Sequence, residues 1–235
     1  MMKLALIGYG AMGQLVELLA KDAGHEVGAV ITSREASDGA GSLVEALRGH
    51  DAAIDFSVAG AVRANVEACV AAGVPLVEGT TGWDAHVETV RQAVERGGGA
   101  LIYGSNFSVG VNLFYRVVAR AAELFGAFDY EPFIEEAHHS RKRDAPSGTA
   151  LRLREIVGAR SPREVPVAST RAGHIPGTHR VGFDGAADQI VLTHAARSRE
   201  GFASGALVAA EWIQGRRGVY EFSETLDEIL KSRKS

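Results

Sequence analysis

The chain has 235 residues, 46% of them hydrophobic and 23% charged, so it can bury a substantial core, and disorder, collagen and coiled coil are excluded. Its formal charge of −4 leaves no basic excess for binding nucleic acid phosphates. A single cysteine, Cys69, excludes an internal disulfide, and the apolar N-terminal run is too short for a signal peptide or a membrane span. We expect a cytoplasmic protein that binds neither nucleic acid nor membrane.

Strands and helices alternate regularly through the first hundred residues. The expected strands are the short apolar runs at residues 3–7, 27–31, 52–56, 76–78 and 101–103. A glycine turn and a helical pattern follow the first strand, further helices are expected at 61–72 and 84–96, and three glycines at 97–99 are expected to end the last of them. This alternation predicts an α/β unit of the Rossmann-like, doubly wound parallel type.

The regular alternation of strands and helices ends after Asn106. A long helix is expected at 111–125, and strands at 129–137, 165–170, 180–183 and 189–195 lack regular intervening helices. The pattern predicts an α+β domain with a mostly open mixed sheet and helices on one face. A helix at 205–214 and a tail at 220–230 are expected to return to the first domain. The expected domains are therefore residues 1–108 plus about 200–235 for a dinucleotide, and 109–199 for substrate.

The loop after the first strand carries a glycine pattern. Gly8, Gly10 and Gly13 form G-x-G-x-x-G between a strand and a helix, where glycines permit a tight turn and close approach of a pyrophosphate to the helix N-terminus. Chance occurrence is the alternative in a chain with 28 glycines, but the strand–turn–helix context favours a dinucleotide site. The residues expected to bind the cofactor here are Gly8, Tyr9, Gly10, Ala11, Met12 and Gly13.

The end of the second strand decides between the two nicotinamide cofactors. NAD-selective proteins carry an acidic residue at this position, where it binds the ribose hydroxyls. This chain has Thr32, Ser33 and Arg34 there, and Glu35 follows one residue later. A guanidinium with neighbouring hydroxyls suits a 2′-phosphate, so NADPH is the preferred cofactor. Two alternatives stay open: Arg34 is a solvated loop charge, or Glu35 binds the ribose and admits NADH.

Two further loops follow the fourth and fifth strands, at the sheet edge where ligands bind in such folds. Their residues are candidates for the nicotinamide end of the cofactor, although Gly, Thr, Ser and Asn also favour ordinary turns. The candidate residues are Gly79, Thr80, Thr81, Gly104, Ser105, Asn106 and Phe107.

The strongest chemical signal is the polar stretch at residues 135–149. Ser147, Gly148 and Thr149 begin a helix with hydroxyl and backbone N–H groups that can bind a substrate carboxylate, and His138, His139 and Lys142 add cationic or proton-donating groups. Adjacent histidines can also bind zinc, but the H-E-x-x-H spacing and nearby cysteines are missing, so no metal is expected. A solvated charged loop is the other alternative.

At these residues the chain resembles the 4-hydroxy-tetrahydrodipicolinate reductase (dihydrodipicolinate reductase) family of bacterial and plant lysine synthesis. The central match is E-A-H-H at 136–139 with K-x-D-A-P-S-G-T at 142–149. Further matches cover nearly the whole chain: I-G-Y-G-A-M-G at 7–13, D-F-S at 55–57, G-T-T-G at 79–82, N-F-S-V-G-V-N at 106–112, R-A-G-H-I-P-G-T-H at 171–179, T-H at 193–194 and F-A-S-G-A at 202–206.

The resemblance implies reduction of 4-hydroxy-tetrahydrodipicolinate, a small cyclic imine dicarboxylate, with hydride from NADPH or NADH in the diaminopimelate route to lysine. It implies that His138 donates or accepts a proton, that Lys142 donates one, and that His139, Gly148 and Thr149 contact the substrate. It also implies hinge closure between the domains and a homotetramer assembled through the second domain. A glycine loop one residue shorter than in many members, Val58 in place of the usual proline and the missing ribose acid concern only the cofactor preference.

Two alternative functions stay open. The first is a non-catalytic NADPH-sensing module, because a Rossmann-like fold alone does not establish an enzyme. The second is another two-domain dehydrogenase of amino-acid metabolism, acting on aspartate or homoserine. A sensing module does not need His138, Lys142 and a carboxylate site at a helix start together, and the other dehydrogenases are not expected to have this combination.

Overall fold

The computed structural model describes residues 1–32 and 40–232. The chain divides into two compact units: unit 1 comprises Met1–Val109 and Glu200–Ser235, and unit 2 comprises Gly110–Arg199. The boundaries expected from the sequence lie after residues 108 and 199. Within the described ranges, no helix is both long and apolar enough to cross a membrane.

Unit 1 is built on a six-stranded sheet in the order β10-β5-β4-β3-β1-β2, in which every neighbouring pair is parallel. Its strands are β1 (Lys3–Ile7), β2 (Glu26–Ile31), β3 (Ala52–Asp55), β4 (Leu76–Glu78), β5 (Ala100–Tyr103) and β10 (Gly218–Glu221). Because β2 and β3 lie on opposite sides of β1, the order changes direction there, and ligands of such sheets bind outside the strands' carboxyl ends. The predicted Rossmann-like parallel sheet is confirmed.

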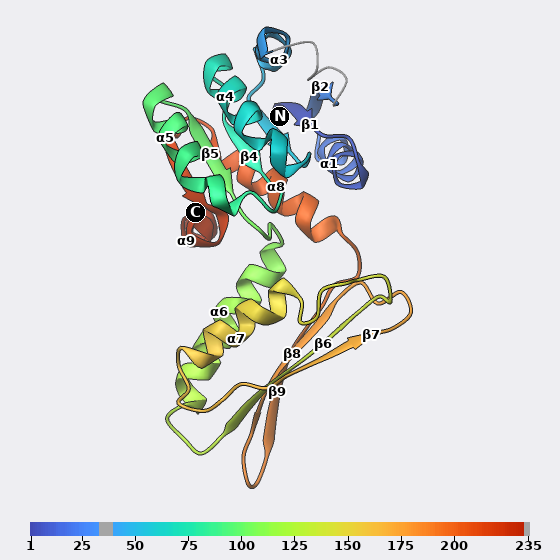
Figure 1. The fold of residues 1–235 in the computed structure, drawn as a ribbon, viewed down its shortest axis with the longest axis vertical. Coiled ribbons are helices and arrows are strands. Elements are labelled where there is room, and N and C mark those ends of the chain that lie inside the picture. The colour runs from blue at the N-terminus through green and yellow to red at the C-terminus, as the bar shows by residue number, and fades with distance from the viewer. Residues whose placement is uncertain (33–39, 233–235) are drawn as a thin grey trace. The chain divides into compact units, whose positions relative to one another are not determined.

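Helices cover both faces of this sheet (Figure 1). They are α1 (Ala11–Asp22), α3 (Ala40–Leu47), α4 (Val62–Ala72), α5 (Val87–Gly97), α8 (Glu200–Ile213) and α9 (Phe222–Ser232), with short 3₁₀ turns at Ala59–Ala61 and Asp84–His86. Val62, Val66 and Cys69 recur on one stripe of α4 and join a core shared with α3, α5 and the sheet. Helix α8 contacts α1 and the central strands from the other face.

The C-terminal tail contributes an edge strand of the sheet. Strand β10 pairs in parallel with β5, with Val219 opposite Leu101, and α9 follows it directly. The expectation that the tail returns to the first unit is confirmed. The strand itself was missed because it has only four residues and begins with Gly218 at a φ of 109°. Helix α3 was missed as well, because Ala, Gly and Ser in its sequence give little periodicity.

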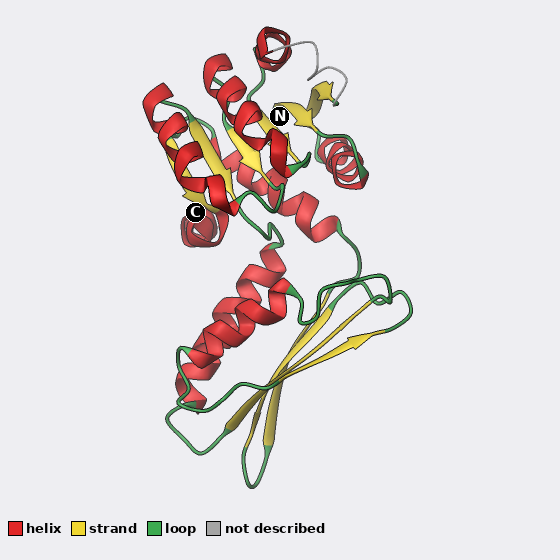
Figure 2. Cartoon of the chain, viewed as in Figure 1, coloured by secondary structure: helices red, strands yellow, loops and turns green. Residues whose placement is uncertain are grey.

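Unit 2 has a four-stranded mixed sheet, β7-β6-β8-β9, in which β6 and β7 are parallel and the other pairs antiparallel. Its elements are α6 (Val109–Phe125), β6 (Glu131–His138), α7 (Gly148–Gly158), β7 (Val167–Arg171), β8 (Thr178–Asp184) and β9 (Gln189–Ala195). Val118 of α6 and Leu153 of α7 pack on Ile134 and Val181, so both helices lie on one face of the sheet (Figure 2). The predicted open mixed sheet with helices on one face is confirmed.

Three strands of unit 2 have limits that differ from the expected ones. Strand β6 continues through His138, β7 ends at Arg171, and β8 begins at Thr178 and so includes His179. These three side chains are therefore held by the sheet and not by loops.

The helix expected at 205–214 begins five residues earlier, at Glu200, and ends at Ile213. Gly205 lies inside it because the backbone of another segment passes at that position: a Cβ on Gly205 would be 1.7 Å from the carbonyl oxygen of Phe107. The glycine allows close packing, whereas in the sequence it resembles a helix start. The prediction of this boundary was wrong for that reason.

We expect Gly205→Ala to destabilise unit 1 by about 1–3 kcal/mol, because the new methyl group must displace the Phe107 backbone. The sign is diagnostic, since glycine to alanine in an unobstructed helix stabilises by about 0.4–1 kcal/mol. Gly158→Ala in α7, where a Cβ meets nothing within 4 Å, is the matched control. Urea unfolding of both variants measures the difference, and equal effects would contradict the packing argument.

Candidate functional site

The glycine loop of unit 1 forms a cradle at the start of α1. Gly8 has a φ of 84°, and a Cβ there would lie 2.5 Å from the carbonyl oxygen of Phe56. A Cβ on Gly13 would lie 2.2 Å from the carbonyl oxygen of Gly8, so both positions require glycine. Gly10 caps the helix with no side-chain hydrogen bond, and a Cβ there would meet nothing within 4 Å. The position of Gly10 at the helix N-terminus is therefore unobstructed, as close approach of a pyrophosphate requires.

The rest of this loop contributes little side-chain chemistry. The Tyr9 hydroxyl donates to Glu17 on α1, and Glu17 also binds the ammonium group of Lys21 at 2.7 Å. Ala11 is exposed and Met12 is half-buried. The predicted interaction of this loop with a cofactor thus depends on its backbone.

The loops after β3 and β4 lie against each other at the same edge. The Phe56 ring occupies the space in which Gly79 would carry a Cβ, 2.1 Å from that position. Thr80 is buried and its hydroxyl accepts the backbone N–H of Ser57 at 3.1 Å, while Thr81 is exposed. The structure therefore brings these candidates together.

The loop after β5 is only partly open. Phe107 is buried against Phe222, with ring centroids 4.8 Å apart, so its side chain belongs to the core of unit 1. The Asn106 side chain accepts the backbone N–H of Ser108, and Ser105 is exposed. Gly104 lies beside Phe222. Arg34 and Glu35, the residues expected to select the cofactor, lie outside the described residues.

The polar stretch of unit 2 is organised around a buried glutamate. Glu136 and His138 lie two residues apart on β6, so both point to the face that carries the helices. Nδ1 of His138 contacts Oε2 of Glu136. Arg171, the partner of His138 on the neighbouring strand β7, donates to Oε1 of Glu136 at 2.6 Å. A fixed positive charge therefore neutralises the carboxylate.

The start of α7 is tied to the same glutamate. Ser147 caps the helix by accepting the backbone N–H of Ala150 at 3.3 Å, and its own backbone N–H donates to Glu136 at 3.4 Å. Its hydroxyl also lies 3.1 Å from Nε2 of His179 on β8. A Cβ on Gly148, the first residue of α7, would meet nothing within 4 Å, so this position is unobstructed.

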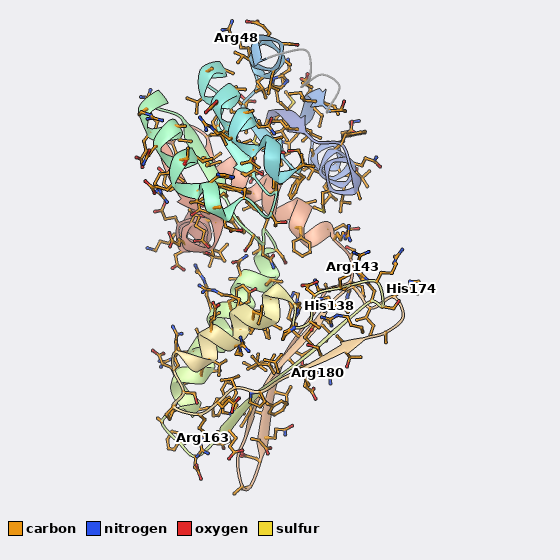
Figure 3. All side chains as sticks on the ribbon, viewed as in Figure 1. Arg48, His138, Arg143, Arg163, His174 and Arg180 are labelled. Carbon is orange, nitrogen blue, oxygen red and sulfur yellow. The ribbon has the colours of Figure 1, made fainter. Side chains whose placement is uncertain are left out.

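The loop between β6 and α7 supplies the lysine. The ammonium group of Lys142 binds Oδ1 of Asp144 at 2.9 Å, and the lysine side chain is 25% exposed. Arg171 holds the backbone carbonyl of Asp144 at 2.6 Å. Nδ1 of His139 is buried without a partner among the described residues. In Figure 3, His138, Arg143 and His174 gather at one end of unit 2, and Arg163 lies at the far end.

Burial and charge set the protonation of this cluster. Burial raises the pKa of Glu136, but hydrogen bonds from Arg171, Ser169 and His138 outweigh it and bring the pKa to about 2. Burial lowers the pKa of His138 against the opposing effect of Glu136, and burial together with His138 lowers the pKa of His179 to about 4. Near neutral pH, Glu136 is therefore ionised and both imidazoles are largely neutral. A neutral His138 that faces an ionised carboxylate must carry its proton on Nδ1, which leaves Nε2 as a proton acceptor.

One group of side chains within the described ranges has a spacing that fits a metal ion. Ligand atoms of Glu136, His138 and His179 lie within 4.8 Å of one another. The guanidinium of Arg171, 2.6 Å from Glu136, opposes a second cation at this place. The cluster is better described as an ion pair with an attached imidazole than as a metal centre.

Sequence reasoning singled out His138, His139, Lys142, Gly148 and Thr149, and all belong to this end of unit 2. It gave no role to three residues at the centre: Glu136, Arg171 and His179. The period of two along a strand could have placed Glu136 beside His138. The partnership with Arg171 could not be inferred, because it depends on the pairing of two strands distant in sequence.

A Rossmann-type unit with a glycine-rich turn at the start of α1, in one chain with a mixed-sheet unit that carries a cluster of ionisable side chains, is typical of a two-domain, nicotinamide-dependent oxidoreductase. Residues 2–107 match the family described as dihydrodipicolinate reductase, N-terminus, and residues 110–226 match dihydrodipicolinate reductase, C-terminus. The chain belongs to the dihydrodipicolinate reductase family.

Individual relatives agree. The chain is 35% identical to 4-hydroxy-tetrahydrodipicolinate reductase of Christiangramia forsetii over 98% of its own length and 100% of the relative's. It is 40% identical to the enzyme of the same name from Methanosarcina barkeri over 75% of the chain and 73% of that protein. The dipicolinate-bound dihydrodipicolinate reductase from Paenisporosarcina sp. TG-14 shares its fold, with a TM-score of 0.78, 22% identity and coverage of 94% and 97%.

We expect Glu136→Gln to lower the pKa of His138 further, because the carboxylate is the group that opposes the effect of burial there. Titration of the histidine ring protons by NMR measures this shift. Glu135→Gln is the matched control: Glu135 is the adjacent residue on β6, is exposed, and pairs with Arg180 on the other face of the sheet. If both variants left the pKa of His138 unchanged, Glu136 would not control that imidazole.

Proposed function

We propose that this chain reduces 4-hydroxy-tetrahydrodipicolinate to tetrahydrodipicolinate with hydride from a reduced nicotinamide dinucleotide, in the diaminopimelate route to lysine. One proton is taken up with the hydride, and the 4-hydroxyl of the substrate leaves as water. The observation that carries the proposal is the cluster of ionisable side chains beside a helix N-terminus at 136–149, within a chain whose two halves both match the reductase family.

The unit 1 loops fit the dinucleotide. The open space beside Gly10 and the N-terminus of α1 accommodate a pyrophosphate, and Gly8 and Gly13 allow the backbone to approach it. We assign the cofactor to Gly8–Gly13, to Gly79, Thr80 and Thr81, and to the segment Gly104–Phe107. When bound, the reduced nicotinamide supplies the hydride for the substrate ring.

The substrate has two carboxylates, and unit 2 offers donors suited to them. The open N-terminus of α7 at Gly148 and Thr149 presents backbone N–H groups, and the unpartnered Nδ1 of His139 adds another polar contact. Binding both carboxylates fixes which face of the ring is presented for reduction.

The reduced ring carries developing negative charge and needs a proton. We assign its delivery to Lys142, whose ammonium group has three donor hydrogens and is held by Asp144. His138 is suited to the complementary step, because its Nε2 accepts a proton when Glu136 fixes the other nitrogen. Gly177 keeps this atom uncrowded, because a Cβ at that position would lie 3.1 Å from Nε2.

We also propose NADPH as the preferred cofactor, a homotetramer assembled through unit 2, and a cytoplasmic location. Arg34 is the candidate for the 2′-phosphate.

The tetramer is proposed to form through the sheet of unit 2. Helices α6 and α7 cover one face of this sheet, and Val191 of β9 is 42% exposed. Cys69 is a buried free thiol, as suits a reducing compartment. A monomer in sedimentation equilibrium would exclude the tetramer.

The function is tested by the loss of reduced-nicotinamide absorbance with freshly made 4-hydroxy-tetrahydrodipicolinate, with NADPH and NADH run in parallel. We expect turnover with both and a higher kcat/KM with NADPH. Equal values would keep the reductase and assign ribose binding in part to Glu35. Tight nucleotide binding without turnover would instead favour the NADPH-sensing module.

We expect Lys142→Ala to lower kcat by about 10²-fold or more while cofactor affinity is nearly kept, the usual scale for loss of a general acid. Lys142→Arg should not restore kcat, because guanidinium keeps the charge but does not release its proton. Arg154→Ala, which removes an exposed cation from α7, is the control. An unchanged kcat in Lys142→Ala would remove this lysine from the mechanism.

A further inference from the structure

Two acidic side chains lie together inside unit 1, in a place that the reaction does not explain. Asp55 ends β3 and Glu78 ends β4, and the two are direct partners in the parallel register. Both are completely withdrawn from solvent. No ion pair joins either of them to a cation in the part of the chain that the structure describes, so nothing there balances two negative charges.

The hydrogen bonds around the pair assign different states to its members. Asp55 accepts from the backbone N–H of Ser57 at 2.8 Å and from the Asn65 side chain at 2.7 Å, as an ionised carboxylate does. Glu78 accepts the backbone N–H of Thr80 at 2.7 Å through Oε1, whereas Oε2 is buried with no partner among the described residues. A proton on Oε2, directed at Asp55, satisfies both groups at once.

The same bonds connect the pair to the loops that leave the sheet. Asp55 holds Ser57 and Glu78 holds Thr80, and the Thr80 hydroxyl accepts the Ser57 N–H at 3.1 Å. The carbonyl of Thr80 in turn accepts the indole N–H of Trp83 at 2.8 Å. The conformation of both loops at the carboxyl edge therefore depends on two buried carboxyl groups.

We propose that Asp55 and Glu78 share one proton, and that this protonated pair is the positioning group that holds the loops after β3 and β4 in the shape that binds the nicotinamide dinucleotide. The inference rests on the proposed assignment of Gly79, Thr80 and Thr81 to the cofactor. It adds two residues that act through these loops and touch neither cofactor nor substrate.

The titration of the pair agrees with this arrangement. Burial, followed by the charge of Asp55, raises the pKa of Glu78 to about 9. Burial also raises the pKa of Asp55, against hydrogen bonds that lower it. The other titratable groups at this place are Cys69 on α4, whose thiol pKa is raised by burial, and Tyr103, the partner of Glu78 on β5.

Loss of the shared proton at high pH leaves two adjacent buried negative charges, which repel each other and loosen the loops. If only the protonated form binds, the apparent Kd for NADPH is about tenfold higher at pH 10 than at pH 7.5, given a Glu78 pKa of about 9. Glu78→Gln keeps the acceptor for Thr80 and a donor for Asp55 without a titrating group. We expect this variant to bind NADPH like the wild type at pH 7.5 and to lose the alkaline weakening.

The experiment is fluorescence titration of the substrate-free full chain with NADPH between pH 7.5 and 10, so that protonation of catalytic groups does not enter. Glu95→Gln, which removes an exposed carboxylate from α5, is the control and should follow the wild type. Infrared spectroscopy at neutral pH should show a protonated carboxyl band that Glu78→Gln lacks.

A second readout follows the folding equilibrium. The pKa of Glu78 is about 9 in the folded chain against an ordinary value of 4.5, so folding takes up a proton between these pH values, and stability falls as pH rises through them. The Tm advantage of Glu78→Gln over the wild type should therefore grow from pH 5 to pH 9 and then level off.

The outcomes distinguish failure of the cofactor site from failure of the positioning role. If NADPH does not bind at pH 7.5, the proposed cofactor site fails. If it binds but the wild type shows no alkaline weakening, or Glu78→Gln weakens equally, the positioning role is wrong. Absence of the carboxyl band in the wild type overturns the shared proton. A growing Tm difference with unchanged NADPH affinity limits the pair to a structural role and also overturns the proposal.

Discussion

A carboxylate taken out of water is tolerated only where donors and positive charge surround it, and the site of unit 2 depends on this requirement at Glu136. The glutamate draws on Arg171 from β7, His138 from its own strand and the backbone of Ser147 at the start of α7. Each contact also places a group that the chemistry needs: an imidazole with a fixed tautomer, and a helix N-terminus open to an anion. In the proposed reaction, substrate binding and proton transfer therefore both depend on this one buried charge.

Unit 1 meets the same requirement in a different way. Asp55 and Glu78 are as deeply buried as Glu136 but have no ion-pair partner in the described ranges. Burial and the charge of Asp55 raise the pKa of Glu78 to about 9, so a proton takes the place of the missing cation, whereas hydrogen bonds from Arg171 and other donors lower the pKa of Glu136 to about 2. The arginine makes the unit 2 site insensitive to alkaline pH at this carboxylate, and the proton makes the unit 1 loops sensitive to it.

The sequence predicted what local patterns control. The strands at 3–7 and 76–78 were located to the residue, because a short apolar run that ends at a glycine turn is typical of a buried strand. Gly205 misled the prediction of α8, since its role is set by the Phe107 backbone and not by its neighbours in sequence. In the site, His138 and Lys142 were found through a local motif, but Arg171 is 35 residues from Glu136 and meets it only because β6 and β7 pair.

The glycines distinguish what the fold requires from what a ligand requires. At Gly8, Gly13 and Gly205 a Cβ would collide with backbone of the chain itself, so these positions would be glycine in any protein with this packing. At Gly10 and Gly148 a Cβ would meet nothing within 4 Å. Packing gives no reason for glycine there, and both residues stand at helix N-termini. These two helix ends are also the places where the proposed reaction needs to hold phosphate and carboxylate groups, and a glycine there lets the backbone come close to such a group.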